Sequence, residues 1–415
     1  MGPQRHGTML RCVPDIEERT RGARFPHLDN LRTVLVAWVI GGHALLGYSA
    51  VGGWAYDEIN EVTFAPASEL ALAAILGPSG LFVIGVFFFV AGLLTERAVD
   101  RHGWRRYASD RVVRLGLPWL VSALLVWPAS VWLAALAAGR DVSFWYEFTH
   151  RDPLLDSGSL WFALVLMLFS VAFALSRPLV ADRRHRERQL AVAGLAAAVI
   201  GIALFSFVVR LWFPARSGQV GDLHLWQWPQ CVGMFVLGLA AARSRWLGHV
   251  PDRIRRTCGA VTLTALGLLP VLALATGIRD LSRDATPYLG GWHWQSLTLA
   301  VMEAVLVVAG SVWLVCLAER RLHRGGPHAA RWARGAFAAF VIQGPMLMAV
   351  ASAGRLLDAP AEVKAPLVAA LSITLCFWIG GYLRSLMGVT RAACRVAGPG
   401  RCPSVRPHDD RARNR

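Results

Sequence analysis

The sequence predicts an all-α membrane protein, a polytopic bundle of about ten transmembrane helices with both termini in the cytoplasm. Of its 415 residues, 55% are hydrophobic and only 17% are charged, and the mean hydropathy is +0.44. Soluble domains carry about 25% charged residues, so this composition excludes an ordinary soluble protein. Apolar runs of about 20 residues, the length that crosses the hydrocarbon core of a bilayer, recur along the chain. No segment keeps a soluble composition for long, and we predict one membrane domain over residues 28–390.

Ten apolar segments are long enough to be transmembrane helices. They cover residues 31–49, 78–97, 115–138, 159–179, 190–212, 224–243, 257–277, 295–319, 333–354 and 365–386. The start of the second segment is poorly marked, and the sixth contains Pro229, a residue that is unfavourable inside a helix. An even number of spans with an arginine-rich tail at each end predicts that both termini are cytoplasmic.

The segments between and beyond the spans differ in charge. The first outer loop, 50–77, has no lysine or arginine, and its part from Ser68 to Leu76 is apolar enough to lie at the membrane interface. The inner loop 97–114 is the most basic short one. The tail 1–27 is polar and rich in arginine, without the cleavage pattern of a signal peptide. The tail 391–415 combines arginine, proline and glycine without periodicity, which is typical of disorder.

The net charge of +16 indicates orientation in a membrane. Most of the 43 lysines and arginines fall in the two tails and in alternate loops, as the positive-inside rule requires. A nucleic-acid-binding protein would gather them in one patch, so we expect no nucleic-acid partner. We predict a multi-pass protein of a bacterial inner membrane, surrounded by lipid. The seven cysteines avoid the predicted outer loops and show no metal-binding spacing, so neither disulfides nor a metal site is predicted.

The first predicted span carries two ionisable residues, Arg32 near its start and His43 near its middle. Eleven residues of α-helix turn through three full turns plus about 20°, so the two side chains share one face, roughly 16 Å apart along the axis. An ionisable side chain at this depth is costly and is a functional candidate by default. The alternative is a structural histidine that is hydrogen-bonded to a neighbouring helix.

Four motifs in the first part of the chain resemble one family. They are Arg32 followed after ten residues by His43, Phe87-Phe88-Phe89-Val90-Ala91-Gly92, Arg111-Val112-Val113-Arg114 with Leu115-Gly116-Leu117-Pro118 directly after it, and Ser159-Leu160-Trp161-Phe162. Together they resemble the acyltransferase-3 integral membrane acyltransferases, most closely the glucan-biosynthesis type C, glucan succinyltransferase-like subgroup. One departure is Gln343, which stands in the ninth span where the family often has a histidine. Glutamine can hydrogen-bond but cannot shuttle a proton.

The resemblance implies a membrane O-acyltransferase that moves an acyl group from cytoplasmic acyl-coenzyme A, a substrate and not a tightly bound cofactor, to a hydroxyl group. The acceptor would be an extracytoplasmic glycan, a lipid-linked saccharide or a small molecule. His43 would be the general base, since imidazole can accept a proton near neutral pH. Arg32, Arg111 and Arg114 would bind the anionic head of the donor, because arginine forms bidentate bonds with phosphate. Topology and lipid headgroups are the alternative explanation for these arginines.

Three further residues are candidates for binding or orienting the acceptor. Glu303, inside the eighth span, would orient the acceptor or pair with His43 or Arg210, and the alternative is a protonated core glutamic acid. Asp57, in the first outer loop, would bind the acceptor. Trp161 would offer a flat apolar face to a sugar ring, or belong to the aromatic belt at the lipid headgroups.

A second class of function fits the same pattern of spans. A multi-pass transporter or flippase for a glycan or a small metabolite also places ionisable groups inside a helical bundle. The sequence shows no internal repeat and no paired interruptions of the kind found in inverted-repeat transporters, which favours the enzyme. The nature of the acyl group, acetyl, succinyl or longer, is left open by the sequence.

Overall fold

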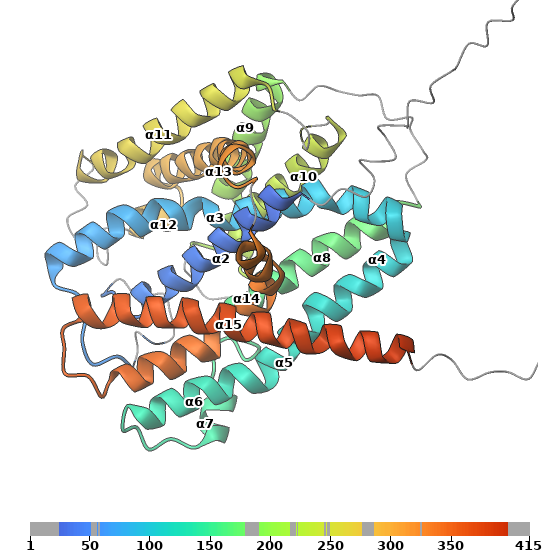
Figure 1. Cartoon of the computed structure of the whole chain (residues 1–415). Coiled ribbons are helices and arrows are strands. Elements are labelled where there is room, and N and C mark those ends of the chain that lie inside the picture. Colours follow the sequence, from blue (N-terminus) through green and yellow to red (C-terminus); the bar gives the residue numbers. More distant parts are fainter. Residues whose placement is uncertain are drawn as a thin grey trace, which may run out of the picture.

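The computed structural model describes residues 25–50, 56, 59–178, 191–215, 221, 223–244, 246, 250–275, 286–323 and 326–396, and these residues form helices and connections without a strand. The long helices gather into one bundle (Figure 1). The elements are α2 (Pro26–Leu46), α3 (Pro66–His102), α4 (Trp104–Arg111), η1 (Val112–Gly116), α5 (Leu117–Val121), η2 (Ser122–Val126), α6 (Trp127–Ala137), α7 (Phe144–Thr149), η3 (Gly158–Leu160), α8 (Trp161–Ser176), α9 (Val192–Val209), η4 (Leu225–Gln227), α10 (Trp228–Arg243), α11 (Asp252–Ala275), α12 (Thr286–Leu289), α13 (Trp294–Arg321), α14 (Pro327–Gly354) and α15 (Ala361–Val396).

Each of the ten predicted spans contains a described helix, which confirms the all-α membrane fold. Seven helical stretches in the described residues are long and apolar enough to cross a membrane. They are α3, the continuous stretch Trp104–Ala137, Gly158–Ser176, α9, α13, α14 and Ala361–Ser385 of α15. The other three predicted spans correspond to α2, α10 and α11, so the count of ten and the cytoplasmic placement of the termini stay predictions.

Several helix boundaries differ from the predicted ones. α2 begins at Pro26, five residues earlier than predicted, because proline is well suited to the first turn of a helix. The second span was expected to start at residue 78, but α3 starts at Pro66 and runs through Pro78. The apolar segment predicted to lie at the interface is therefore the first part of α3. α15 continues to Val396, past the predicted end of the domain at 390.

The basic segment 97–114, which was expected to be a loop, is helical except at Gly103, and two π-helical turns connect it to and interrupt the span that follows. The first, η1, ends at Gly116 and the second, η2, at Val126, each two residues before a proline, Pro118 and Pro128. Proline has no N–H, and its ring clashes with the carbonyl four residues earlier, so an inserted residue relieves the clash by widening the turn. Trp104–Ala137 thereby continues as one long helical stretch.

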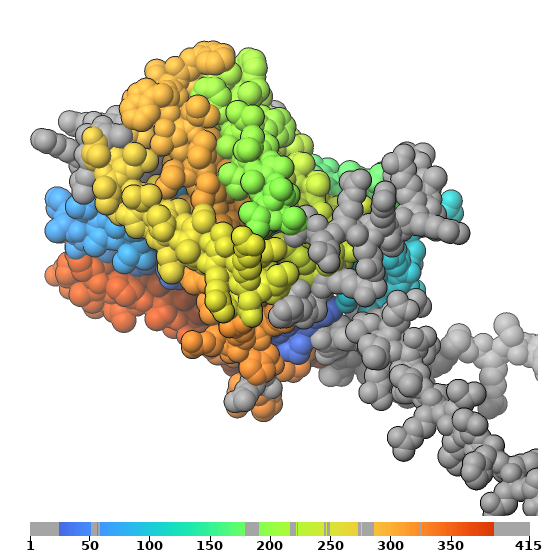
Figure 2. Space-filling view, turned by 90° about the horizontal axis from the view of Figure 1, so that it is seen from above, coloured from blue at the N-terminus to red at the C-terminus, as the bar shows by residue number. Residues whose placement is uncertain are grey.

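Helix α2 lies in the middle of the bundle and serves two hydrophobic cores. In Figure 1 it runs between α3 and the pair α14 and α15. Its first half buries Leu28, Leu31 and Leu35 in the core formed with α3, α8, α10 and α13. Its second half buries Ile40 and Ala44 in the core formed with α6, α14 and α15. On another face, α9 and α11 pack against α13 at the surface (Figure 2). Because α2 joins both cores, both halves of the helix are anchored by buried side chains.

Paired glycines allow the closest helix crossings. A Cβ at Gly92 of α3 would collide with the carbonyl oxygen of Phe235, and one at Gly238 of α10 would collide with the carbonyl oxygen of Phe89. Gly335 of α14 and Gly380 of α15 approach in the same way. Small residues let helix backbones approach closely, which is a main source of helix association in membranes.

Replacing Gly92 with valine should therefore destabilise the bundle by about 1–3 kcal/mol or more, because a side chain would meet backbone that cannot move aside. Thermal unfolding of the purified protein in detergent measures the effect. The matched control is Gly201→Val in α9, where an added Cβ meets nothing within 4 Å. Equal melting temperatures for the two variants would contradict the proposed role of the glycine crossing.

Candidate functional site

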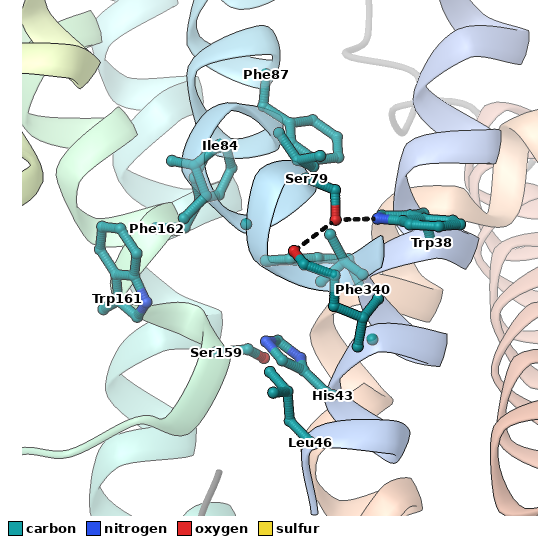
Figure 3. Close-up of a pocket in the computed structure, with 15 residues that line it drawn as sticks. Trp38, His43, Leu46, Ser79, Ile84, Phe87, Ser159, Trp161, Phe162 and Phe340 are labelled. Atoms are coloured by element: carbon teal, nitrogen blue, oxygen red, sulfur yellow. Dashed lines mark hydrogen bonds between the residues drawn. The ribbon is translucent and has the colours of Figure 1, made fainter. Parts of the chain in front are cut away.

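His43 lies in the wall of a cavity of about 150 Å³ between α2 and α3. Figure 3 shows its imidazole pointing from α2 toward Ser159, which belongs to the η3 turn before α8. The rest of the wall is mostly aliphatic and aromatic, with Phe162 from α8 and Phe340 from α14. The predicted base therefore faces an internal space where four segments of the chain meet, and does not face lipid alone.

A chain of hydrogen bonds holds His43 in place. Nδ1 of His43 lies 3.4 Å from Oε1 of Gln343, near the upper limit of hydrogen-bonding distance. Nε2 of Gln343 donates to Oγ of Ser159 at 3.0 Å, and Gln343 is completely buried. Since an amide oxygen can only accept, this arrangement puts the proton of a neutral imidazole on Nδ1 and the lone pair on Nε2. Nε2 is then the atom that can accept a proton.

The side of the cavity formed by α3 was not found by sequence reasoning. Trp38 of α2 donates from Nε1 to Oγ of Ser79 at 3.0 Å, and Ser79 donates to the carbonyl of Leu76 (Figure 3). The Trp38 residue is 44% exposed, so its hydrogen bond with Ser79 lies at the mouth of the cavity. Ser79 and Gly80 fall at the poorly marked start of the predicted second span, 78–97, and were given no role.

Trp161 lines the same cavity as His43 and is only 9% exposed. One of its faces stacks on the ring of His224, with the ring centroids 4.3 Å apart. A tryptophan of the headgroup belt would face lipid or water, so the belt interpretation is wrong for this residue. Trp161 and His224 form a wall that joins α8 to the segment before α10.

Each of the three predicted donor-binding arginines has a partner on its own stretch of helix. Arg32 pairs with Asp29 at 3.7 Å, and its charge lies within electrostatic range of Arg111. The guanidinium of Arg111 lies 4.8 Å from the centre of the Tyr107 ring. Arg114 lies in the π-helical turn η1, its side chain is 64% exposed, and it pairs with Asp110 at 3.4 Å.

Glu303 does not contact His43. It forms a fully buried ion pair with Arg210, with Nη2 and Oε2 2.5 Å apart and the side chains 3% and 2% exposed. The guanidinium of Arg210 also lies 5.4 Å from the centre of the Trp226 ring. Of the two partners that the sequence suggested for Glu303, His43 and Arg210, Arg210 is the one observed. Asp57 lies outside the described residues.

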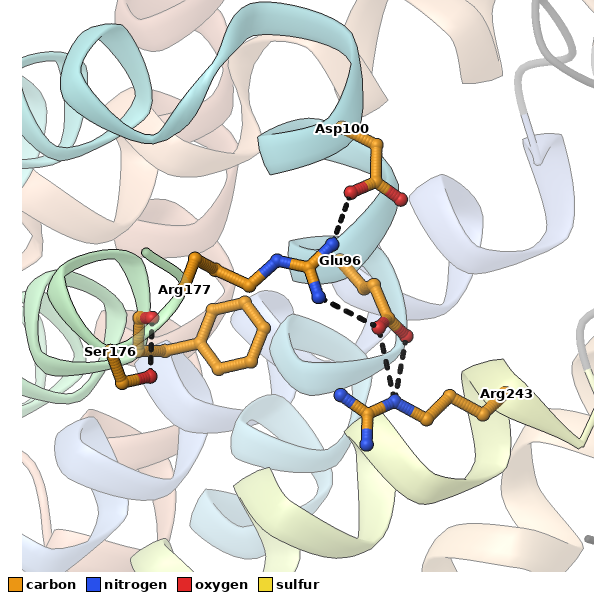
Figure 4. A network of polar contacts seen from close by, with 6 residues as sticks. Glu96, Asp100, Ser176, Arg177 and Arg243 are labelled. Atoms are coloured by element: carbon orange, nitrogen blue, oxygen red, sulfur yellow. Dashed lines mark hydrogen bonds and ion pairs between the residues drawn. The ribbon is translucent and has the colours of Figure 1, made fainter. Parts of the chain in front are cut away.

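A second polar network was missed by sequence reasoning. The carboxylate of Glu96, near the end of α3, accepts from Nε of Arg243 at 3.0 Å and lies 3.7 Å from Arg177 (Figure 4). Arg177 also pairs with Asp100 at 2.6 Å. Arg177 and Arg243, which the sequence analysis did not single out, join the ends of α3, α8 and α10 through this network. Within the described parts of the chain, no three His, Cys, Asp or Glu side chains are arranged to hold a metal ion.

Comparison with known proteins gives one finding about the whole chain. The family model of acyltransferase type 3, described as "Acyltransferase domain", matches residues 25–383. No curated protein and no solved structure matches the chain. The matched region includes every described residue of the cavity and the hydrogen-bond chain from His43 to Ser159.

Removal of one partner of the buried Arg210–Glu303 pair should be strongly destabilising. Arg210→Met leaves a carboxylate buried without its counter-charge, which costs about 3–5 kcal/mol, whereas Arg210→Met combined with Glu303→Leu removes both charges and should recover most of the loss. Thermal unfolding in detergent measures both variants. Equal melting temperatures for the double and the single variant would contradict the idea that an unpaired buried carboxylate causes the loss of stability.

Proposed function

The chain belongs to the acyltransferase-3 family and is a multi-pass membrane acyltransferase, and we propose that it transfers an acyl group from acyl-coenzyme A to a hydroxyl group with His43 as the general base. The observation that carries this proposal is the hydrogen-bond chain from Ser159 through Gln343 to His43, which ends in a cavity. A histidine with only a structural role would need a partner but no space beside its ring.

The chemistry requires one proton acceptor next to the thioester. The acceptor hydroxyl gives its proton to Nε2 of His43 while its oxygen attacks the thioester carbonyl carbon. The tetrahedral intermediate then collapses, the carbon–sulfur bond breaks, and the proton passes from the imidazolium to the leaving thiolate. The products are the ester and free coenzyme A. Gln343 holds the imidazole in the tautomer that this step needs, although it cannot itself carry a proton.

The donor and the acceptor approach His43 from opposite ends of α2. Arg32 and Arg111 would bind the anionic head of acyl-coenzyme A at the cytoplasmic face, and Arg114 would add charge at the rim. Arg32 and His43 lie eleven residues apart in one uninterrupted helix, roughly 16 Å along its axis. An extended pantetheine arm would cover this distance. This orientation rests on the positive-inside pattern, with both termini cytoplasmic and the protein in a bacterial inner membrane.

The acceptor would be a hydroxyl of an extracytoplasmic glycan, a lipid-linked saccharide or a small secreted molecule. Trp161 and the neighbouring Arg210–Glu303 region are the described groups that would orient it, together with Asp57. Likeness to the glucan-biosynthesis subgroup supports a glycan. Transport of such a molecule is the competing function, and a thioester assay separates the two, because only an enzyme consumes the thioester in detergent, where no gradient exists.

His43→Ala should lower acyl transfer by at least about 100-fold, because a positioned general base contributes on the order of 10²–10⁴ in rate. The measurement is release of free coenzyme A from acyl-coenzyme A by the purified protein in detergent with envelope extract as the acceptor source. The matched control is His102→Ala, since His102 is exposed and lies at the end of α3. Full activity of a folded His43→Ala protein would refute the assignment.

Arg32→Gln and Arg111→Gln should each raise the KM for acyl-coenzyme A by roughly tenfold, because a hydrogen bond between charged groups contributes about 1.5–3 kcal/mol. The value of kcat should change little. Arg106→Gln removes the same charge from an exposed position in α4 and is the control for total charge. Equal KM values for all three variants would mean that these arginines do not bind the donor.

A further inference from the structure

We propose that the transferred acyl group is uncharged and that Gly80 leaves the space in which it lies. In this arrangement the acyl group lies in the cavity beside His43, against the face of α3 that is centred on Gly80. The inference rests on the proposed function, which supplies the acyl donor, and it selects among the acetyl, succinyl and longer groups that the sequence left open.

The volume of the cavity sets how much of the acyl group lies beside His43. An apolar cavity of about 150 Å³ in a protein interior holds a molecule such as benzene, with six carbon atoms. The cavity beside His43 has this volume. Acetyl, propionyl and butyryl groups fit within it, and a longer acyl chain would extend through the mouth beside Trp38, which is 44% exposed.

The chemistry of the wall excludes a charged occupant. Among the described residues that line the cavity, none is Asp, Glu, Lys or Arg. The polar groups are His43, Ser79, Ser159 and the indole N–H groups of Trp38 and Trp161, and the indole of Trp38 donates to Ser79. Arg32, on the same helix, lies about 16 Å away along the axis. The free carboxylate of a succinyl group would be buried without a counter-charge, which costs several kcal/mol. A sugar acceptor would likewise lack partners here, so the apolar space suits the acyl group.

Gly80 occupies the central position on the α3 side of the cavity. Leu76 and Ile84, four residues before and after it, line the cavity, as does Phe87 one further turn along. Positions at this spacing share one face of a helix, so a side chain at position 80 would project between them. A Cβ at Gly80 would meet no atom within 4 Å, so a larger residue fits there without displacing the backbone. The absence of a side chain at this position leaves room for the acyl group.

The first measurement is a competition between donors. Membranes that contain the full chain receive equal amounts of acetyl-, propionyl-, butyryl-, hexanoyl- and succinyl-coenzyme A, and the esters released by mild base are quantified by mass spectrometry. Membranes with the His43→Ala variant give the background. Succinyl ester should form roughly 100-fold less than butyryl ester, because the unpaired charge costs several kcal/mol. Succinyl as the main product overturns the inference while leaving the proposed function intact.

Substitution of Gly80 tests whether this position provides space for the acyl group. Gly80→Val should lower butyryl transfer relative to acetyl transfer by about tenfold or more, since a change of one methylene in an apolar pocket is worth 10- to 200-fold. Gly201→Val, the same change on α9 at an open site outside the cavity, should leave this ratio as it is. A ratio that Gly80→Val does not change overturns the role of Gly80.

A binding measurement decides the inference even if no donor is turned over. Acetyl, butyryl and succinyl thioesters of N-acetylcysteamine, which lack the nucleotide, are added to the purified protein in detergent, and the melting temperature is recorded. The butyryl thioester should raise it and the succinyl thioester should not, and Gly80→Val should remove the shift. The absence of a His43-dependent ester in the first measurement refutes the proposed function. Equal shifts for butyryl and succinyl, or none for any thioester, refute the cavity assignment.

Discussion

The hydrogen bond between His43 and the buried Gln343 is the interaction on which the arrangement of the site depends. An imidazole inside a membrane bundle is costly unless it has a polar partner, and a buried amide must satisfy its own donors and acceptor. The chain Ser159–Gln343–His43 meets both requirements at once, with distances of 3.0 and 3.4 Å. It also joins α2, α14 and the start of α8, three segments that are far apart in the sequence. The polar groups therefore fix both the tautomer of His43 and the meeting point of these helices.

The position of α2 explains why this geometry is rigid. Its first half belongs to the core with α3, α8, α10 and α13, and its second half to the core with α6, α14 and α15. A shift of α2 would disturb both cores, and close packing makes interiors resist such shifts. The cavity lies beside α2 where α3 crosses it with few contacts. The rigid helix thus carries the proposed base, while the looser contact with α3 leaves space for the group that reacts.

The sequence predicted what depends on local pattern and missed what depends on distant contacts. Hydropathy located helices in all ten predicted spans, and the helical repeat placed Arg32 and His43 on one face, because these properties follow from neighbouring residues. The start of α3 was wrong because Pro78 lies inside the helix, where proline is unfavourable, and not at its start. Gln343, the hydrogen-bond partner of His43, is 300 positions later in the sequence, so their contact could be found only from the fold. The same holds for the pairing of Glu303 with Arg210 and for the α3 face of the cavity.

The distribution of charge along α2 connects the fold to the choice of substrate. Arg32 lies near the start of α2, where its charge is within electrostatic range of Arg111. Three helical turns later, the cavity beside His43 has no charged residue in its described wall. A donor that carries its charges at one end and its acyl group at the other, joined by a long neutral arm, matches this division. A donor with charge at both ends does not, because its second charge would be buried without a partner. The separation of arginines from the apolar cavity therefore acts as a filter on the acyl group, and His43 stands where that group must arrive.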